Sequence, residues 1–221
     1  MQKIDVLDKG FVALLDHKGS DVDIARAARV LPTADWRDVE DPKLIRYMLK
    51  NRHNTPFEHV VFTFWVKAPI FVYRQWHRHR TQSYNEQSAR YMVLDAEFYV
   101  PDPAMIGEQS AKNHQARVIS DEDAEFRASE VVGYQRSCED AAKTYRWLLD
   151  RGWPRELARM VLPVSTYSEM TTTVNLHNLF HFLSLRDDAH AQHEIRAYAK
   201  AIIELIRPVV PVAVAAWEES R

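Results

Sequence analysis

Cysteine is nearly absent from this chain of 221 residues, and that scarcity excludes two kinds of site. Cys138 is the only cysteine, so the chain can form neither an internal disulfide framework nor a metal site built from several thiolates. Tyr134, Cys138, Ala141 and Tyr145 recur at helical spacings of four and three. We therefore expect Cys138 to be packed on the apolar face of a long helix rather than to act as a nucleophile.

Glycine is scarce as well. The five glycines stand at positions 10, 19, 107, 133 and 152, and none of them forms a Gly-x-Gly-x-x-Gly turn or a Gly-rich phosphate loop. If the chain binds a nucleotide, its phosphates must therefore be held by side chains.

Long apolar runs and a strong excess of one charge are also missing. No stretch reaches the roughly 18 uncharged apolar residues of a membrane helix, and the segment Met1–Asp5 lacks the pattern of a secretion signal. We expect a cytoplasmic protein with no membrane partner. The net charge of −2 and the pI near 6.6 disfavour a protein whose main partner is a nucleic acid polymer.

Hydrophobic patterning predicts an α/β fold in one domain over residues 1–221, with a mixed or antiparallel sheet flanked by helices, one of them long. Residues 4–15 are typical of two short strands. Apolar residues occupy both alternating faces of 59–68, which predicts a strand buried on both sides. Pro69 then fits the first turn of a helix through Arg80.

The other predicted elements follow from caps and periodicity. They are short helices from Asp21 or Asp23 to Val30 and from Asp41-Pro42 through Met48, a polar loop at 81–91, a long helix from about Asp121 to Asp150, a helix from Pro154 through Met160, an extended segment at 164–175, helices at 175–186 and 190–206, and an apolar tail at 209–217 that could form a subunit interface.

The segment 74–91 combines cations with many hydrogen-bonding groups. On a helix, Gln75, Arg78 and His79 share one side, because they are three and four residues apart. A polar stretch from Ser83 to Arg90 follows directly. Guanidinium groups bind phosphate in a two-pronged geometry, and hydroxyl groups and loop amides complete such sites. The segment therefore predicts an anion-binding site.

A solvated basic helix end is the plainer explanation of these cations, and composition alone favours it, because positive residues are common in the last turn of a helix. The surroundings argue against it. An apolar strand precedes the segment, and we expect Phe71, Trp76 and Tyr91 to tether both of its ends to a core. Cations held so close to buried surface usually have partners.

A specific motif lies inside the same segment. Arg78-His79-Arg80 is followed, after seven residues, by Ser88, and Asn85, Glu86, Arg90 and Tyr91 complete the pattern. This pattern resembles the signature of flavin-dependent thymidylate synthases. The resemblance extends over nearly the whole chain and includes the stretches Asp5–Phe11, His53–His59, Lys67–Phe71, Pro154–Arg159, Leu162-Pro163 and Arg186–Gln192.

The resemblance implies an activity and an assembly. The enzyme would convert dUMP to dTMP, for dTTP biosynthesis, by reductive methylation. Methylenetetrahydrofolate would donate the one-carbon unit, and reduced FAD, regenerated by NADPH, would supply the hydride. The family-specific fold forms homotetramers whose active sites are shared between subunits.

The resemblance also implies which residues hold dUMP. Arg186 matches the residue that stabilises charge on the uracil ring, and a permanent cation there lowers the cost of developing negative charge. Ser88 lacks an obvious general base, so we favour binding over nucleophilic attack for it, although its position is among the catalytic ones. The implied contacts are Gln75, Arg78 and the loop Glu86, Gln87, Ser88, Ala89 and Arg90 from one subunit, with Arg159 and Arg186 from another.

The implied FAD site uses many of the same cations. Family members often carry Arg and Asn where this chain has His177 and His181. Both histidines can donate hydrogen bonds, so we expect FAD binding to survive the change. His53 matches a catalytic position near the flavin ring. The implied cofactor-binding residues are Thr55, Arg78, His79, Arg80, Glu86, Asn175, His177 and His181.

Two other functions are compatible with parts of the sequence. His177 and His181, and likewise His190 and His193, have spacings that suit metal ligands, as in a metal-dependent hydrolase. The first pair lacks the glutamate of the known zinc motif, so we expect no metal. A second alternative is an RNA-binding module, because aromatic residues lie beside the Arg and His cluster. The mildly acidic net charge disfavours it.

Overall fold

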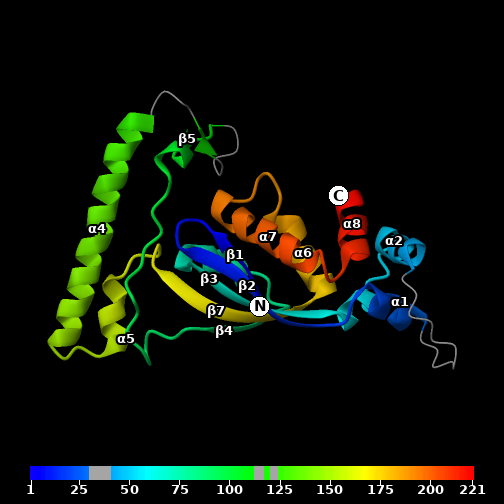
Figure 1. Ribbon diagram of the computed structural model, residues 1–221. Helices are drawn as coiled ribbons and strands as arrows, with labels where there is room; N and C mark the ends of the chain where they lie inside the picture. The colour runs from blue at the N-terminus through cyan, green and yellow to red at the C-terminus, as the bar shows by residue number, and fades with distance from the viewer. Residues whose placement is uncertain (30–40, 112–116, 120–123) are drawn as a thin grey trace.

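The computed structural model describes residues 1–29, 41–111, 117–119 and 124–221, and its centre is a five-stranded antiparallel sheet (Figure 1). The predicted α/β fold with helices flanking the sheet is confirmed. The strands lie in the order β1 (Gln2–Val6), β2 (Gly10–Lys18), β3 (Val61–Pro69), β7 (Tyr167–Asn175) and β4 (Ser83–Glu86). A separate pair of short strands, β5 (Glu108–Gln109) and β6 (Arg117–Val118), lies near the top of the long helix in Figure 1.

The expected pair of strands in residues 4–15 is confirmed as the β1–β2 hairpin. Val6 pairs with Gly10 where the chain turns. A Cβ at Gly10 would lie 2.0 Å from the hydroxyl oxygen of Tyr198 and 2.8 Å from the carbonyl oxygen of Lys67. Only glycine therefore fits this close approach between the hairpin and helix α7 (His193–Ile206).

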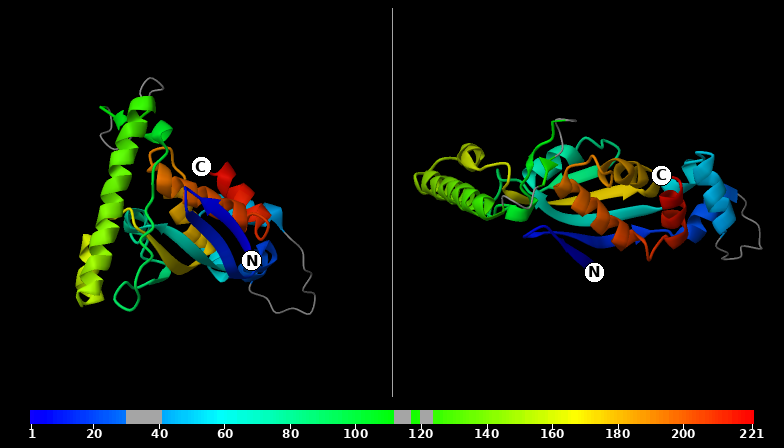
Figure 2. Two further views of the ribbon diagram at one scale, coloured as in Figure 1. Left: turned by 60° about the vertical axis from the view of Figure 1, so that its left-hand side comes forward. Right: turned by 90° about the horizontal axis from the view of Figure 1, so that it is seen from above.

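Strand β3 is confirmed at the centre of the sheet, but the expectation that both of its faces are buried is wrong. Phe62 and Phe64 are fully buried, whereas Thr63 and Trp65 on the opposite face are partly exposed. Helices α6 (Leu176–Arg186) and α7 cover only one face of the sheet (Figures 1 and 2). The other face carries polar contacts, among them a hydrogen bond of 2.9 Å from the Trp65 indole to Glu169.

One end of the sheet carries three short helices, α1 (Asp21–Arg29), α2 (Pro42–Lys50) and α8 (Pro211–Glu219), and the 3₁₀ turn Thr55–His59. The buried Asp21 carboxylate accepts hydrogen bonds from the backbone of Val212 and Ala213, at 2.8 and 3.0 Å. Carboxylates at helix N-termini are favourable because unpaired amides point at them. The apolar tail is thus fixed in the core as α8, with Trp217 buried, and a subunit interface there stays a prediction.

The long helix α4 (Ala124–Asp150) stands at the other end of the sheet, beside the short helix α5 (Arg155–Ala158) and the 3₁₀ turn Arg159–Val161 (Figure 2). Its predicted start at Asp121 lies outside the described residues. Cys138 is buried on this helix against Phe98 and Ala142, so its packed position is confirmed.

Two expectations around the site were wrong. The helix after β3, α3 (Ile70–Trp76), ends four residues before Arg80. The loop expected at 81–91 contains strand β4, whose backbone pairs with the edge of β7 from Ser83 to Glu86. Polar side chains suit an edge strand because one of its faces meets solvent. Within the described residues, no helix combines the length and apolar character needed to cross a membrane.

Candidate active site

The site begins where helix α3 ends, because side chains from other elements bind its last carbonyl groups. The Arg186 guanidinium donates through Nη2 to the carbonyl of Gln75, at 3.1 Å. The Tyr84 hydroxyl lies 3.2 Å from the carbonyl oxygen of Trp76 and 2.6 Å from that of His79. These donors replace backbone partners that a longer helix would supply, so the chain turns away after Trp76.

After this turn, Arg78, His79 and Arg80 line a cavity of about 650 Å³, which we call the cationic hollow. Helix α6 forms its other wall. Three arginines and three histidines line the hollow, and no aspartate or glutamate is among its described lining residues, so it suits an anionic ligand. Its lining consists of Arg78, His79, Arg80, Thr81, His177, Asn178, His181, Leu185 and Arg186.

His79 is the buried member of this group, with 6% of its surface exposed. Its Nε2 accepts a hydrogen bond of 2.9 Å from Nε of Arg186. Burial, then the charge of Arg186, then His181 lower the pKa of His79 to about 4. Burial also lowers the pKa of Arg186, which stays cationic because a guanidinium keeps its proton in proteins.

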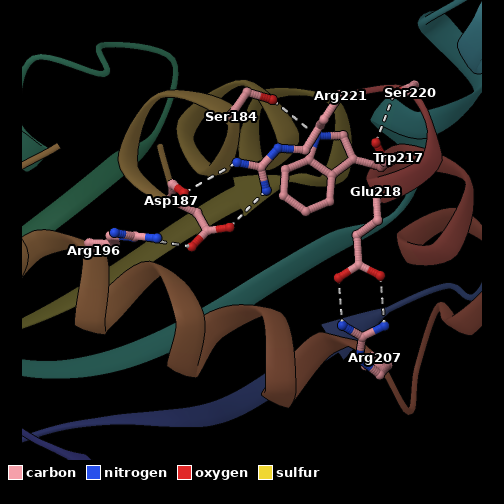
Figure 3. Close-up of polar contacts among 8 residues, drawn as sticks. All are labelled: Ser184, Asp187, Arg196, Arg207, Trp217, Glu218, Ser220 and Arg221. Atoms are coloured by element: carbon pink, nitrogen blue, oxygen red, sulfur yellow. Dashed lines mark hydrogen bonds and ion pairs between the residues drawn. The ribbon is translucent and has the colours of Figure 1, made fainter. Parts of the chain in front are cut away.

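The end of α6 that carries Arg186 is anchored from its solvent side (Figure 3). Asp187, the next residue, forms an ion pair of 2.7 Å with Arg221 and lies 4.0 Å from Arg196. The Trp217 indole donates to the Ser184 hydroxyl at 3.0 Å. Helix α6 is thereby held against α7 and α8. These contacts fix the backbone position of Arg186.

A second cavity, of about 360 Å³, lies beside α3, and we call it the Ser88 hollow. Arg74 and His77 face it from α3 and the turn that follows, and Arg159 faces it from the other side. The loop that carries Ser88 is held by backbone, because the Gln87 amide donates to the Glu169 carbonyl at 2.8 Å. The lining residues are Ile70, Tyr73, Arg74, His77, Glu86, Gln87, Ser88 and Arg159.

The loop also contacts the α5 region. Arg90 forms an ion pair of 3.4 Å with Glu156, and Arg155 donates to the carbonyl of Tyr91 at 2.9 Å. Ala89 is buried within the loop, whereas Tyr91 is 78% exposed, so the expectation that Tyr91 tethers this end to a core is wrong. Arg90 therefore reaches toward α5 and is not among the residues that line either hollow.

The structure groups the expected substrate residues differently from the sequence-based expectation. Arg159 and Arg186 were expected to reach dUMP from the same neighbouring subunit, yet within one chain they line different hollows. Arg78 and Ser88 are separated in the same way. Arg159 stands on the 3₁₀ turn after α5, whereas Arg186 stands at the end of α6, so different elements carry the two guanidinium groups.

Four further positions lie apart from the lining of both hollows. His53 and Thr55 are exposed at the 3₁₀ turn before β3, and the His53 ring lies 5.8 Å from that of Tyr47. Asn175 caps α6 by accepting from the backbone of Asn178 at 2.9 Å. The side chain of Gln75 bonds to Gln192. A role for these side chains in binding stays a prediction.

Sequence patterns missed several lining residues. Arg74 and His77 have the spacing of three that places them on one side of α3, and this was the available signal. Asn178 and Leu185 extend the α6 face of His181, at spacings of three and four. Tyr84 carries no such signal, because its contact with the end of α3 depends on the pairing of β4 with β7.

The metal-dependent alternative gains no support from this geometry. Among the described residues, no three His, Cys, Asp or Glu side chains are grouped so that they could hold a metal ion. His190 is exposed and bonds to Asp188 at 2.8 Å, while His181 faces His79 in the cationic hollow.

Comparison with known proteins decides the family. A family model described as "Thymidylate synthase complementing protein" matches residues 13–212. The chain belongs to this family. Its relatives among thymidylate synthase complementing proteins include the flavin-dependent thymidylate synthase of Treponema denticola, 48% identical over 218 residues, which cover 98% of this chain and 82% of that protein. An enzyme of the same name from Thermus thermophilus is 49% identical over 219 residues, with 98% and 78% covered.

A solved member of similar structure is the UMP/dUMP methylase PolB from Streptomyces cacaoi, bound with 5-Br UMP. It superposes with a TM-score of 0.87 at 39% identity, and the match covers 98% of this chain and 97% of that one. The family resemblance noted from the sequence is confirmed by these matches, and the fold is that of the thymidylate synthase complementing proteins.

Proposed function

We propose that this chain is a flavin-dependent thymidylate synthase that methylates dUMP reductively to dTMP. The observation that carries the proposal is the cationic hollow, in which the motif Arg78-His79-Arg80 meets Arg186. Relatives 48% and 49% identical over nearly the whole chain carry this name. The single-domain organisation over residues 1–221 and the cytoplasmic location stay predictions.

The cationic hollow fits the charge of FAD. The pyrophosphate of FAD is anionic, and the exposed Arg78 and Arg80 supply guanidinium groups without any glycine-rich loop. His177 and His181, one turn apart on α6, face the same hollow. Asn175, Thr55 and Glu86 are proposed as further contacts, because they match the family's positions.

The Ser88 hollow is proposed to hold dUMP. The Ser88 hydroxyl and the Arg159 guanidinium are suited to the phosphate of the nucleotide, with Gln87 beside them. Arg90 is proposed to join them when it leaves Glu156. Ser88 acts as a binding group here, since no described base lies within hydrogen-bond distance of its hydroxyl.

Arg186 and Arg78 are proposed to complete this nucleotide site from another subunit. One chain keeps them in a different hollow from Ser88, so a site that contains both sets needs two chains. Arg186 would stabilise negative charge on the uracil ring, because a fixed cation needs no reorganisation as charge develops. When bound in reduced form, FAD supplies the hydride, while methylenetetrahydrofolate supplies the one-carbon unit and NADPH restores the reduced cofactor.

Exposed apolar side chains support the proposed homotetramer. Met160 is 69% exposed, Val164 59% and Trp147 54%, and all three belong to α4 and the segment after it. Exposed apolar side chains that form a patch mark protein contact sites. Met160 directly follows Arg159, which lines the Ser88 hollow, so contact there would bring a second chain close to the nucleotide.

UMP is a second candidate substrate, because PolB is named as acting on both UMP and dUMP. The two substrates differ only in the 2′-hydroxyl group. Assays with each nucleotide in parallel decide between them. A rate with UMP equal to that with dUMP would identify a methylase without discrimination between the two sugars.

Subunit mixing tests the shared site. We expect Arg78→Ala and Arg159→Ala each to lose most of the dTMP formation from dUMP, methylenetetrahydrofolate and NADPH. Co-assembled chains of the two variants should regain part of the rate, because some sites then receive neither substitution. Arg207→Ala is the matched control, since Arg207 pairs with Glu218 away from both hollows. A mixture no more active than either variant alone would contradict the shared site.

A further inference from the structure

We infer that His79 is a positioning residue, which holds the Arg186 guanidinium in place for the reaction. The inference rests on the proposed function of the cationic hollow. Two contacts carry it, one from Nε of Arg186 to Nε2 of His79 at 2.9 Å and one from Nη2 to the carbonyl of Gln75 at 3.1 Å. Two adjacent N–H groups bound at once fix both the place and the plane of a guanidinium.

The contact defines the chemical state of the imidazole. A guanidinium Nε–H only donates, so Nε2 of His79 must offer its lone pair, and the ring is neutral with its hydrogen on Nδ1. The surroundings favour this state. Arg78 and Arg80 come from the same segment, and His177, His181 and Arg186 come from α6. These groups are cationic or can become so, and protonation of His79 would add a charge among them.

Neighbouring rings lock the imidazole in this orientation. The Phe182 ring lies 4.8 Å away, edge to face, and the His181 ring lies 5.9 Å away. Phe182 is fully buried in the core. His79 therefore transmits the rigidity of the core to Arg186, which is only partly buried.

The contact with Arg186 limits the hydrogen bonds that His79 can donate to a phosphate. Nε2 is occupied by Arg186, so only Nδ1 remains to donate to an anionic ligand. The principal contribution of His79 is then indirect. It aims the remaining N–H groups of Arg186 at the place where negative charge develops, and prior alignment of such donors is a large part of catalysis.

A double-mutant cycle tests this role. His79→Leu removes the acceptor at similar size and is expected to lower the turnover number at saturating dUMP by about 100-fold, the usual effect of losing one aligned donor. His79→Gln offers an amide oxygen near the place of Nε2 and should stay within about tenfold of the parent chain. In an Arg186→Ala background, His79→Leu should cost less than about twofold, because its target is gone. If the losses of turnover caused by His79→Leu and Arg186→Ala multiply in the double variant, the inference is overturned.

Binding and spectroscopy supply readouts besides activity. Calorimetry with dUMP should show a smaller change in dissociation constant than in turnover for His79→Leu. If His79→Leu fails to fold, His79→Gln alone tests the role. A loss of turnover above about 100-fold in His79→Gln, with normal flavin content, contradicts the role. In ¹⁵N-histidine spectra, the resonance that His79→Gln removes should report an unprotonated Nε2 at about pH 7, and a protonated Nε2 would refute the inference. Failure of the proposed function would appear separately, as a parent chain that binds no flavin and forms no dTMP.

Discussion

Acidification should destabilise the folded chain through His79, and the size of the effect follows from its pKa. The folded chain holds this pKa at about 4, below the ordinary value of 6.5. Between these values the unfolded chain binds a proton that the folded chain does not. The contribution of His79 to stability is therefore complete above about pH 6.5 and is lost as the pH falls toward about 4.

The magnitude is large for a single side chain. One pKa unit corresponds to about 1.4 kcal/mol, so the full loss is at most about 3.5 kcal/mol, and about 2 kcal/mol of it should be gone at about pH 5. Replacement by glutamine removes the titrating group. The parent chain should therefore lose about 2 kcal/mol more than His79→Gln between about pH 7.5 and about pH 5.

Urea unfolding of the ligand-free protein at several pH values measures this difference. Bound anions would stabilise the cationic hollow and must be absent. His17→Gln, which replaces an exposed histidine of β2, is the matched control. A difference between the parent and His79→Gln that stays constant from about pH 7.5 to about pH 5 would refute the assigned burial and charge environment of His79.

Three substitutions test other parts of the structure. Ser88→Ala should weaken dUMP binding yet keep measurable turnover, and complete loss of turnover with binding intact would reveal a nucleophile. Gly10→Ala should lower the free energy of unfolding by about 2 kcal/mol or more, because its Cβ would meet the Tyr198 hydroxyl oxygen at 2.0 Å; a neutral effect in denaturant titration would contradict that contact. Asp21→Ala should lower the free energy of unfolding by about 2 kcal/mol, since it leaves the amides at the start of α8 without their carboxylate. Asp5→Ala, at an exposed position, should change this free energy little. Equal losses in the two variants would argue against the buried cap.

Local sequence signals were sufficient where the structure depends on local geometry. The alternation in 59–68 placed β3, the four-three spacing around Cys138 placed the buried face of α4, and Asn175 capped α6 where a helix was expected. These features depend on backbone periodicity and on side chains a few residues away. The motif Arg78-His79-Arg80 was likewise visible as a unit.

Long-range contacts explain the features that the sequence did not predict. Helix α3 ends at Trp76 because Tyr84 and Arg186 bind its last carbonyls, and Arg186 is distant in sequence. β4 forms because the edge of β7 is free to pair with it. Arg159 and Arg186 line different hollows because they stand on different elements, the 3₁₀ turn after α5 and the end of α6. None of these contacts has a periodic signature.

Single-turnover chemistry tests the central claim most directly. The protein with bound FAD is reduced under anaerobic conditions and mixed with dUMP and methylenetetrahydrofolate, and flavin reoxidation and dTMP are then followed in the same quenched samples. We predict one dTMP for each flavin reoxidised, with the rate of dTMP formation lowered by at least about 100-fold in Arg186→Ala. Reoxidation without dTMP, or dTMP formed equally well by protein stripped of flavin, would contradict the proposed function.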